Sequence, residues 1–416
     1  MGVTIKPFRA VRPKPQLAAS VAALPYDVMN TEEARETAAG NPYSFLRVDK
    51  AEIDLPPETD PYDAKVYSQA KKNFCELINS AMIQDEEKNF YIYRLTGCGQ
   101  VQTGLAACVS AAEYERGLIK RHEFTRPDKE LDRINHMLAC EAHTGPIFLA
   151  YRGEFESPAK IMAQYTKNTP EYSFVADDGV KHELWVVADD ATKNALVRAF
   201  EKIPALYIAD GHHRNATAAI VAKQRAGDAD AEHNFYLAVI FPHDELAIFD
   251  YNRVVTDLNG ATPAEFLRKI SADWNVEKIS SQAKPAKKFE VGMYLRGEKT
   301  NDTDSHGWYR LTLKNPPVSA DAIENLDCSV LQNILLAPIL GINDPRTDKR
   351  IDFVGGIRGL AELERRVNSG ETAVAFAMFP TSMDELMAVA DANQIMPPKS
   401  TWFEPKLRSG LLVHLF

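Results

Sequence analysis

Apolar and polar positions along this chain form short blocks that predict many strands and helices. Apolar runs of strand length occur at 90–95, 146–151 and 182–187, where Val, Ile, Leu and aromatic residues dominate. Longer stretches at 62–82 and 191–200 have the three-to-four-residue apolar spacing of amphipathic helices. Because both kinds of block mix along the whole chain, we expect a mixed α/β (α+β) fold.

The most informative part of this pattern is a predicted strand, turn and helix near the middle of the chain. An apolar run ends at Asp210, Gly211 permits a sharp turn, and an Ala-rich amphipathic stretch follows. His212, His213 and Arg214 crowd the turn, where the free N–H groups of a helix start favour an anion. The turn therefore predicts a phosphate site, with a capped helix start and hydrogen-bonded imidazoles as the structural alternative.

The rest of the pattern predicts how the chain divides. A polar segment without a fixed period, residues 280–288, indicates a surface insertion or linker. We expect a core domain at 1–280 that contains the turn, and a C-terminal α/β part at 289–416.

The pattern also predicts two local elements. Asn41–Val48 is predicted to be a turn that enters a short strand. The runs at 235–242 and 247–255 are predicted to form one hairpin.

Composition and charge exclude several classes of protein. The 416 residues are 45% hydrophobic, which is enough for one large core or two to three domains. The net charge of −10 argues against nonspecific DNA binding, so we expect no nucleic-acid partner. No apolar run reaches about 18 residues, so no membrane span is expected. Five scattered cysteines and an N-terminus without an apolar targeting run indicate a cytoplasmic protein.

A second polar segment lies immediately before a helix that is predicted to begin at Pro127. Glu123 supplies a potential proton acceptor and Arg126 a guanidinium that can hold phosphate. Lys129 and Arg133, four residues apart, share one face of the predicted helix and make it cationic. A solvated charged helix is the alternative interpretation.

Near the end of the chain, a proline-stiffened segment gathers cations and hydroxyls. Lys399, Ser400, Thr401 and Lys406 suit phosphate by their chemistry, although the segment lacks the upstream glycines of a P-loop.

Several segments together resemble the signatures of the domain-of-unknown-function 1015 (DUF1015) family. They are 7–9, 25–28, 41–48, 122–126, 209–214, 250–254, 350–356 and 396–406. The turn Asp210-Gly211-His212-His213-Arg214 is also similar to the phosphate-binding turn of archaeal free-serine kinases. That similarity implies a ParB/sulfiredoxin-like core with large N- and C-terminal elaborations. It further implies a phosphotransferase, a small-molecule kinase that acts on free L-serine or O-phospho-L-serine.

Phosphoryl transfer requires charge neutralisation, a positioned hydroxyl and a proton acceptor, and the residues above can be assigned to these roles. We expect four catalytic residues: Glu123 as general base, with Asp210, His212 and His213. The expected phosphate-binding residues are Gly211, Arg214, Arg126, Lys129, Lys399, Ser400, Thr401 and Lys406. Asp27 and Arg47 are expected to bind the ammonium and carboxylate of a serine substrate. Mg²⁺ is expected to accompany a nucleotide or pyrophosphate donor, and no metal ligands are assigned.

Two other functions stay open at this point. Asp and His side chains of the turn could instead hold a metal ion in a phosphoserine phosphatase, which is a hydrolase. A ParB-like fold could also bind nucleotide as a regulator without catalysis. The phosphate donor, whether ATP, ADP or pyrophosphate, and the oligomeric state, with a homodimer as one option, are open as well.

Overall fold

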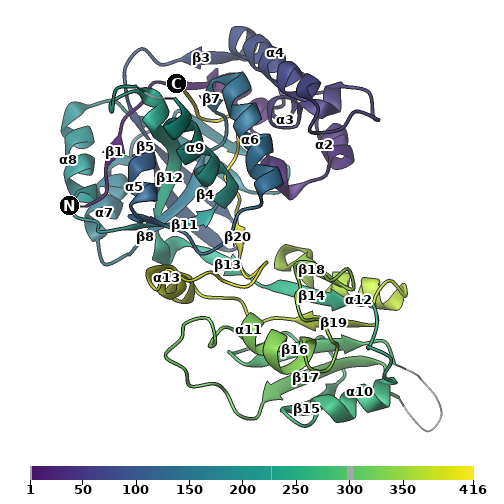
Figure 1. The fold of residues 1–416 in the computed structure, drawn as a ribbon. Coiled ribbons are helices and arrows are strands. Elements are labelled where there is room, and N and C mark those ends of the chain that lie inside the picture. The colour runs from purple at the N-terminus through teal and green to yellow at the C-terminus, as the bar shows by residue number, and fades with distance from the viewer. Residues whose placement is uncertain (1, 226, 298–303) are drawn as a thin grey trace. The chain divides into compact units, whose positions relative to one another are not determined.

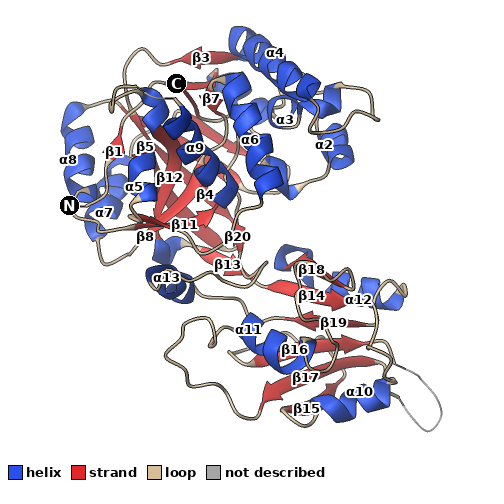
Figure 2. Cartoon of the chain, viewed as in Figure 1, coloured by secondary structure: helices blue, strands red, loops and turns tan. Residues whose placement is uncertain are grey.

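The computed structural model describes residues 2–225, 227–297 and 304–416 (Figure 1). The chain forms two compact units: unit 1 comprises Met1–Leu246 and Pro405–Phe416, and unit 2 comprises Ala247–Glu404. Helices and strands alternate in both units, which confirms the mixed α/β class (Figure 2). The polar segment 280–288, where we expected a boundary, lies inside unit 2, where it joins two strands of one sheet.

Unit 1 is built on a nine-stranded sheet. Its order is β6 (Ile119–Lys120), β11 (Leu206–Asp210), β8 (Ile147–Tyr151), β12 (Phe235–Pro242), β5 (Gln100–Ser110), β4 (Phe90–Gly97), β10 (Lys181–Val187) and β9 (Tyr172–Val175), with β1 (Ile5–Lys6) paired to β5. All eight residues of β12 are buried. An almost wholly apolar strand of this kind suits the middle of a sheet that is covered on both faces.

Helices cover this sheet, and a second small sheet lies beside it. The longer helices are α4 (Ala64–Ala81), α6 (Pro127–Cys140), α7 (Glu156–Tyr165), α8 (Asp190–Phe200) and α9 (His212–Gln224). The short ones are α1 (Ala18–Val21), α2 (Thr31–Thr37), α3 (Leu46–Asp49) and α5 (Ala111–Glu115). The second sheet has the order β3 (Met82–Gln84), β2 (Ala10–Pro13), β21 (Val413–Leu415) and β7 (Ala142–His143). The C-terminal strand β21 is therefore an inner strand of this sheet.

Unit 2 has its own sheet and its own buried cluster. The order is β15 (Trp274–Ile279), β17 (Gly307–Leu313), β16 (Glu290–Leu295), β19 (Val374–Ala377), β14 (Tyr251–Val255) and β18 (Ile351–Gly355). A two-stranded sheet pairs β13 (Ala247–Phe249) with β20 (Trp402–Glu404). The helices are α10 (Pro263–Ile270), α11 (Asp327–Leu331), α12 (Gly359–Asn368) and α13 (Met383–Asp391).

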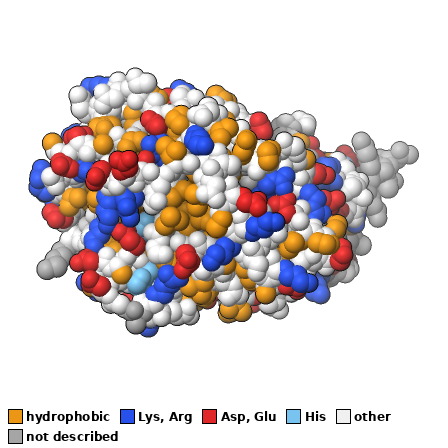
Figure 3. Space-filling view, turned by 90° about the horizontal axis from the view of Figure 1, so that it is seen from above, with side chains coloured by type: hydrophobic (Ala, Val, Ile, Leu, Met, Phe, Trp, Pro, Cys, Tyr) orange, Lys and Arg blue, Asp and Glu red, His pale blue; other side chains and the backbone are white. Residues whose placement is uncertain are grey.

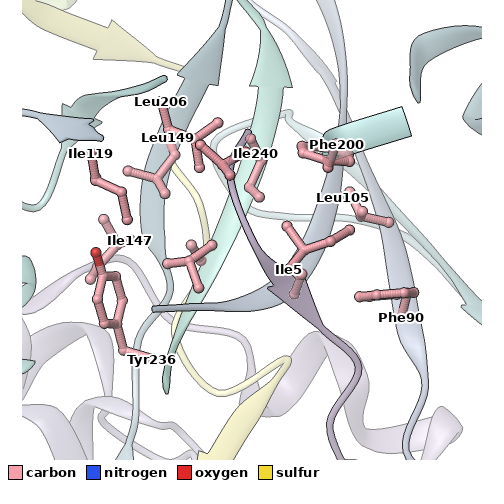
Figure 4. Close-up of a cluster of buried hydrophobic side chains, with 14 of the residues drawn as sticks. Ile5, Phe90, Leu105, Ile119, Ile147, Leu149, Phe200, Leu206, Tyr236 and Ile240 are labelled. Atoms are coloured by element: carbon pink, nitrogen blue, oxygen red, sulfur yellow. The ribbon is translucent and has the colours of Figure 1, made fainter. Parts of the chain in front are cut away.

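The main core of unit 1 lies where helices meet the nine-stranded sheet. Figure 4 shows part of it, where Leu105, Leu149, Leu206 and Ile240 from four strands gather with Phe200 of α8. Burial of each such side chain contributes roughly 1.5–3 kcal/mol of transfer free energy. None of the described helices combines the length and the apolar run that a bilayer crossing requires.

On the face drawn in Figure 3, basic and acidic side chains are interspersed among white and orange atoms. This mixture of charges agrees with the composition of the chain, which has 48 basic and 58 acidic residues.

Two local predictions are wrong. Residues 41–48 do not enter a strand, because Leu46–Asp49 form helix α3, whose Leu46 and Val48 are buried in an apolar cluster. The side chain of Asn41 accepts the Tyr43 N–H at 3.0 Å and turns the chain into this helix.

The predicted hairpin 235–255 is also absent from the described structure. Strand β12 pairs with β5 and β8 in unit 1, whereas β13 and β14 pair within unit 2. The chain leaves unit 1 between the two predicted strands, a change that strand propensity alone does not reveal.

Truncation of a fully buried core side chain should destabilise unit 1. Leu149 of β8 is completely buried, so Leu149→Ala removes apolar contacts and leaves a cavity, which should cost about 3 kcal/mol of unfolding free energy. Urea denaturation of both proteins measures the difference. Val101→Ala is the control, because Val101 is 53% exposed and its loss should change stability by less than about 0.5 kcal/mol. Equal effects of the two variants would contradict the assignment of this core.

Candidate functional site

The predicted strand, turn and helix are present at the edge of the nine-stranded sheet. Strand β11 ends at Asp210, where a register shift against β8 falls between Ile208 and Asp210. Gly211 follows with φ +92° and ψ 34°, a left-handed conformation that costs other residues free energy. The first N–H groups of α9, like those of any helix, have no intrahelical acceptors. No side chain in the described residues caps this helix start, so these groups lack a side-chain acceptor as well.

Arg214 lies over this glycine. A Cβ at position 211 would come within 3.1 Å of the Arg214 guanidinium, so a larger residue would displace it. The guanidinium is nearly buried and donates to the carbonyl of Pro146, while its Nε has no acceptor within the described parts of the chain. A buried cationic N–H without a partner is costly, and an anion at the turn would satisfy it.

Asp210 is held in its charged form by two cations. Its Oδ2 lies 3.2 Å from Lys406 Nζ and 3.9 Å from an Arg214 nitrogen. Burial alone would raise the pKa of Asp210, but Lys406 and Arg214 outweigh it and lower the pKa well below its ordinary value. The result is an ionised carboxylate between two positive groups, a compact charge network at the end of β11.

Lys406 is supplied by the C-terminal segment, which returns from unit 2 to unit 1. Gln102 donates to the Pro405 carbonyl at 3.1 Å. Arg408 Nε donates to Nε2 of His182 at 3.3 Å, and Nη2 of the same arginine pairs with the Asp178 carboxylate. These bonds anchor the segment on both sides of Lys406, which is only 8% exposed. The lysine is therefore fixed in place and contributes to the site across 196 residues of sequence.

A second group of proton-carrying side chains lies on the other side of the turn. His212 Nδ1 is 3.8 Å from Glu123 Oε2, and the His122 and His212 rings meet edge to face with centroids 4.4 Å apart. Burial lowers the pKa of His122 to about 4 and, together with the neighbouring His122, lowers the pKa of His212 well below its ordinary value. Both imidazoles are neutral near pH 7. Glu123 is the more accessible member, with its side chain 41% exposed.

His213 faces the segment that begins α6. Its Nε2 accepts the Arg126 N–H at 3.1 Å, so Nδ1 carries the proton of the neutral ring. Burial lowers the pKa of His213, against the opposing effect of Asp27 and Glu130. Asp27 is exposed, and its charge acts on this imidazole.

The remaining predicted residues are engaged elsewhere. The Arg126 side chain pairs with Asp128 at 2.8 Å, and Lys129 Nζ donates to the Tyr62 hydroxyl at 2.7 Å. Arg47 donates to the carbonyls of Asn41 and Ala38 and pairs with Asp54, so its guanidinium braces the chain around α3.

Lys399, Ser400 and Thr401 belong to unit 2. The Ser400 hydroxyl is buried and donates to the Pro397 carbonyl at 2.7 Å, and Lys399 Nζ lies 5.6 Å from the centre of the Tyr251 ring. Thr401 is half-buried and directly precedes β20. Their part in phosphate binding stays a prediction.

The polar groups behind Arg214 had no predicted role at the site. They line a cavity of about 30 Å³ that includes Tyr26, Asp49, Arg133 and Thr144. Such a volume holds about two water molecules. Arg133 had been placed on the cationic face of its helix, and in the structure it lies over the Tyr26 ring at 4.1 Å. The cavity is too small for a nucleotide.

Comparisons with known proteins give one family and several distant structures. The family model described as "Protein of unknown function (DUF1015)" matches residues 5–329. Among curated proteins, none matches. Similar solved structures include a variant of a free serine kinase in complex with ADP, at 12% identity and TM-score 0.37, covering 74% of this chain and 92% of the other.

Two further solved structures are similar at the same level. SbnI with a C-terminal truncation, from Staphylococcus aureus, has 12% identity and TM-score 0.38, covering 74% of this chain and 87% of the other. A conserved hypothetical protein from Pyrococcus furiosus has 13% identity and TM-score 0.34, covering 74% and 95%. We therefore take the function from the chemistry of the site.

Substitution of Gly211 should test the contact between the turn and Arg214. Gly211→Ala adds both left-handed strain and a clash with the guanidinium, and should cost at least about 2 kcal/mol of unfolding free energy. Gly117→Ala is the matched control, because Gly117 has φ +77° with no atom within 4 Å of an added Cβ, so only about 1 kcal/mol of strain is expected. Urea denaturation measures both. Equal costs would mean that Arg214 does not pack on the turn.

Stability should depend on pH through His182, which anchors the C-terminal segment. Burial and the nearby Arg408 lower the pKa of His182 from 6.5 to about 3. Between these values the unfolded chain binds the extra proton, so the free energy of unfolding falls as pH drops, by up to about 1.4 kcal/mol per pH unit. In His182→Asn, this contribution to the pH dependence of the unfolding free energy should be absent. Urea titrations of both proteins at about pH 4.5 and about pH 7 measure it. An unchanged slope would show that His182 is solvated.

Proposed function

The chain belongs to the DUF1015 family, whose description assigns no activity, and we propose that it transfers a phosphoryl group between a nucleotide or pyrophosphate donor and the hydroxyl of free L-serine. The observation that carries this proposal is the Arg214 guanidinium, nearly buried over Gly211 with its Nε unpaired among the described residues, next to Lys406. An N–H of this kind donates to an oxygen of a tetrahedral oxyanion such as phosphate.

Charge at the turn suits phosphoryl transfer. Transfer leaves negative charge on the oxygens of the moving group, and fixed cations and N–H groups stabilise that charge. Arg214, Lys406 and the uncapped N–H groups of α9 supply them within one turn. Asp210 keeps the two cations together before any phosphate arrives. Because burial holds these groups in place, little reorganisation is needed when the donor binds.

The acceptor side requires a base and a place for the amino acid. Glu123 is accessible and stands next to His212, which makes it the best available acceptor for a serine hydroxyl proton. Asp27, on the His213 side, is the group we assign to the serine ammonium. In this proposal Arg47 does not bind the substrate carboxylate, since Asn41, Ala38 and Asp54 occupy its guanidinium.

The donor binds on the open side of the turn, because the cavity behind Arg214 holds only water-sized groups. Mg²⁺ enters with the donor phosphates, since Asp210 is committed to two cations. Arg126 and Lys129, both on the surface beside His213, supply further phosphate contacts once they leave Asp128 and Tyr62.

The reaction can be assigned with two kinds of incubation of the purified protein. Serine with ATP, ADP or pyrophosphate plus Mg²⁺ should give phosphoserine, detected by mass spectrometry. Phosphoserine with Mg²⁺ alone should release no phosphate. Release of phosphate without an acceptor would instead indicate a phosphatase. Absence of both reactions, together with a higher melting temperature in nucleotide, would indicate a regulator.

Two variants should separate the phosphate side from the acceptor side. Glu123→Gln should lower kcat by about 100-fold or more while KM for the donor changes little, because only the proton acceptor is lost. Lys406→Met should raise the KM for the donor as well as lower kcat. Lys223→Met is the control, since Lys223 is 78% exposed near the far end of α9 and should leave turnover unchanged. Full activity of Glu123→Gln would exclude this residue as the base.

A further inference from the structure

His122, Glu123 and His212 converge although two separate segments supply them. Strands β6 and β11 run parallel, with Ile119 opposite Leu206 and Lys120 opposite Tyr207. Parallel strands end at the same edge of a sheet, so the residues that follow them meet there. One ligand atom from each of the three side chains lies within 4.8 Å of the others.

The His122 side chain has no visible structural reason for its burial. It is 2% exposed, and neither ring nitrogen has a hydrogen-bond partner within the described ranges. The Ile208 carbonyl lies near enough to raise its pKa slightly, but outside hydrogen-bond geometry. Buried polar atoms are almost always paired, and an unpaired one calls for an unseen partner such as an ion. A carbonyl behind the ring is the usual support of a metal-bound histidine.

The spacing of the three groups suits a metal ion. Each imidazole can offer a ring nitrogen and the carboxylate an oxygen. Two ligands around a tetrahedral ion with bonds of about 2.0–2.2 Å are roughly 3.3–3.5 Å apart, and His212 Nδ1 lies 3.8 Å from Glu123 Oε2. The backbone N–H of His122 makes only a long contact, 3.4 Å, to Nε2 of His212. That contact is lost when Nδ1 of His212 becomes a metal ligand, because Nε2 then carries the proton of the neutral ring.

We propose that His122, Glu123 and His212 bind one divalent first-row transition-metal ion, of which Zn²⁺ is the probe of choice. Two imidazoles and a carboxylate favour such an ion over Mg²⁺, so this site is distinct from the Mg²⁺ that enters with the donor. Glu123 would bind the ion through one carboxylate oxygen and keep the other for the proton of the serine hydroxyl. Three protein ligands leave coordination positions open on the accessible Glu123 side. An ion there lies at the phosphate turn, where it can bind and acidify a hydroxyl.

The proposal is tested by metal binding, so its outcome does not depend on whether phosphoryl transfer occurs. Untagged full-length protein is stripped with a chelator and titrated with Zn²⁺ by calorimetry, and with Co²⁺ while its visible absorption is recorded. We expect one ion per chain and the absorption of a Co²⁺ site with fewer than six ligands. Glu123→Gln and His122→Asn should each weaken Zn²⁺ binding by at least about 100-fold.

Two controls distinguish an effect on Zn²⁺ binding from an effect on folding. Glu123 is partly exposed, so Glu123→Gln should keep the wild-type melting temperature without metal even if His122→Asn does not. His233→Ala is the matched control, because His233 also has a ring nitrogen without a partner in the described residues but lies in another loop. It should bind Zn²⁺ like the wild type. Absence of stoichiometric binding by the wild type, or wild-type affinity in Glu123→Gln, would overturn the proposal.

Discussion

The ion pair between Asp210 and Lys406 is the interaction on which the candidate site depends. It joins two parts of unit 1 that are separated in the sequence by unit 2, the middle of the chain and the segment that begins at Pro405. A surface ion pair would contribute little, but this lysine is almost fully buried and Arg214 lies on the same carboxylate. Removal of Lys406 would leave the Asp210 carboxylate with the more distant Arg214 at 3.9 Å, and removal of Asp210 would leave two neighbouring cations without their shared carboxylate, so either change should cost free energy of unfolding.

Local features of the site could be predicted because short-range chemistry decides them. Asp210 at the end of an apolar run, Gly211 at φ +92° and an Ala-rich helix are consequences of neighbouring residues, and the structure has all three. The start of α6 at Pro127 followed from helix-start preferences in the same way. The mixed α/β class follows from the same periodicity.

Long-range features could not be predicted, because a single sequence does not show which distant residues come into contact in the folded chain. Arg47 has the chemistry of a carboxylate receptor, and only the structure shows its three local oxygen partners. Strand propensity in 247–255 was correct, yet it could not show that the chain had entered another sheet. The sequence does not show that His122 meets His212, because the parallel pairing of β6 with β11 is what brings the two rings together.

The interruption of unit 1 by unit 2 also has a consequence for biosynthesis. Domains generally fold in the order in which the ribosome makes them, and unit 2 is one continuous stretch that can fold as soon as it emerges. Unit 1 has to wait, because an inner strand of its small sheet and the lysine beside Asp210 are translated after unit 2. A nascent chain therefore carries the turn through 196 residues of elongation without this cation, and the charge network of the turn is completed only after unit 2 has been made.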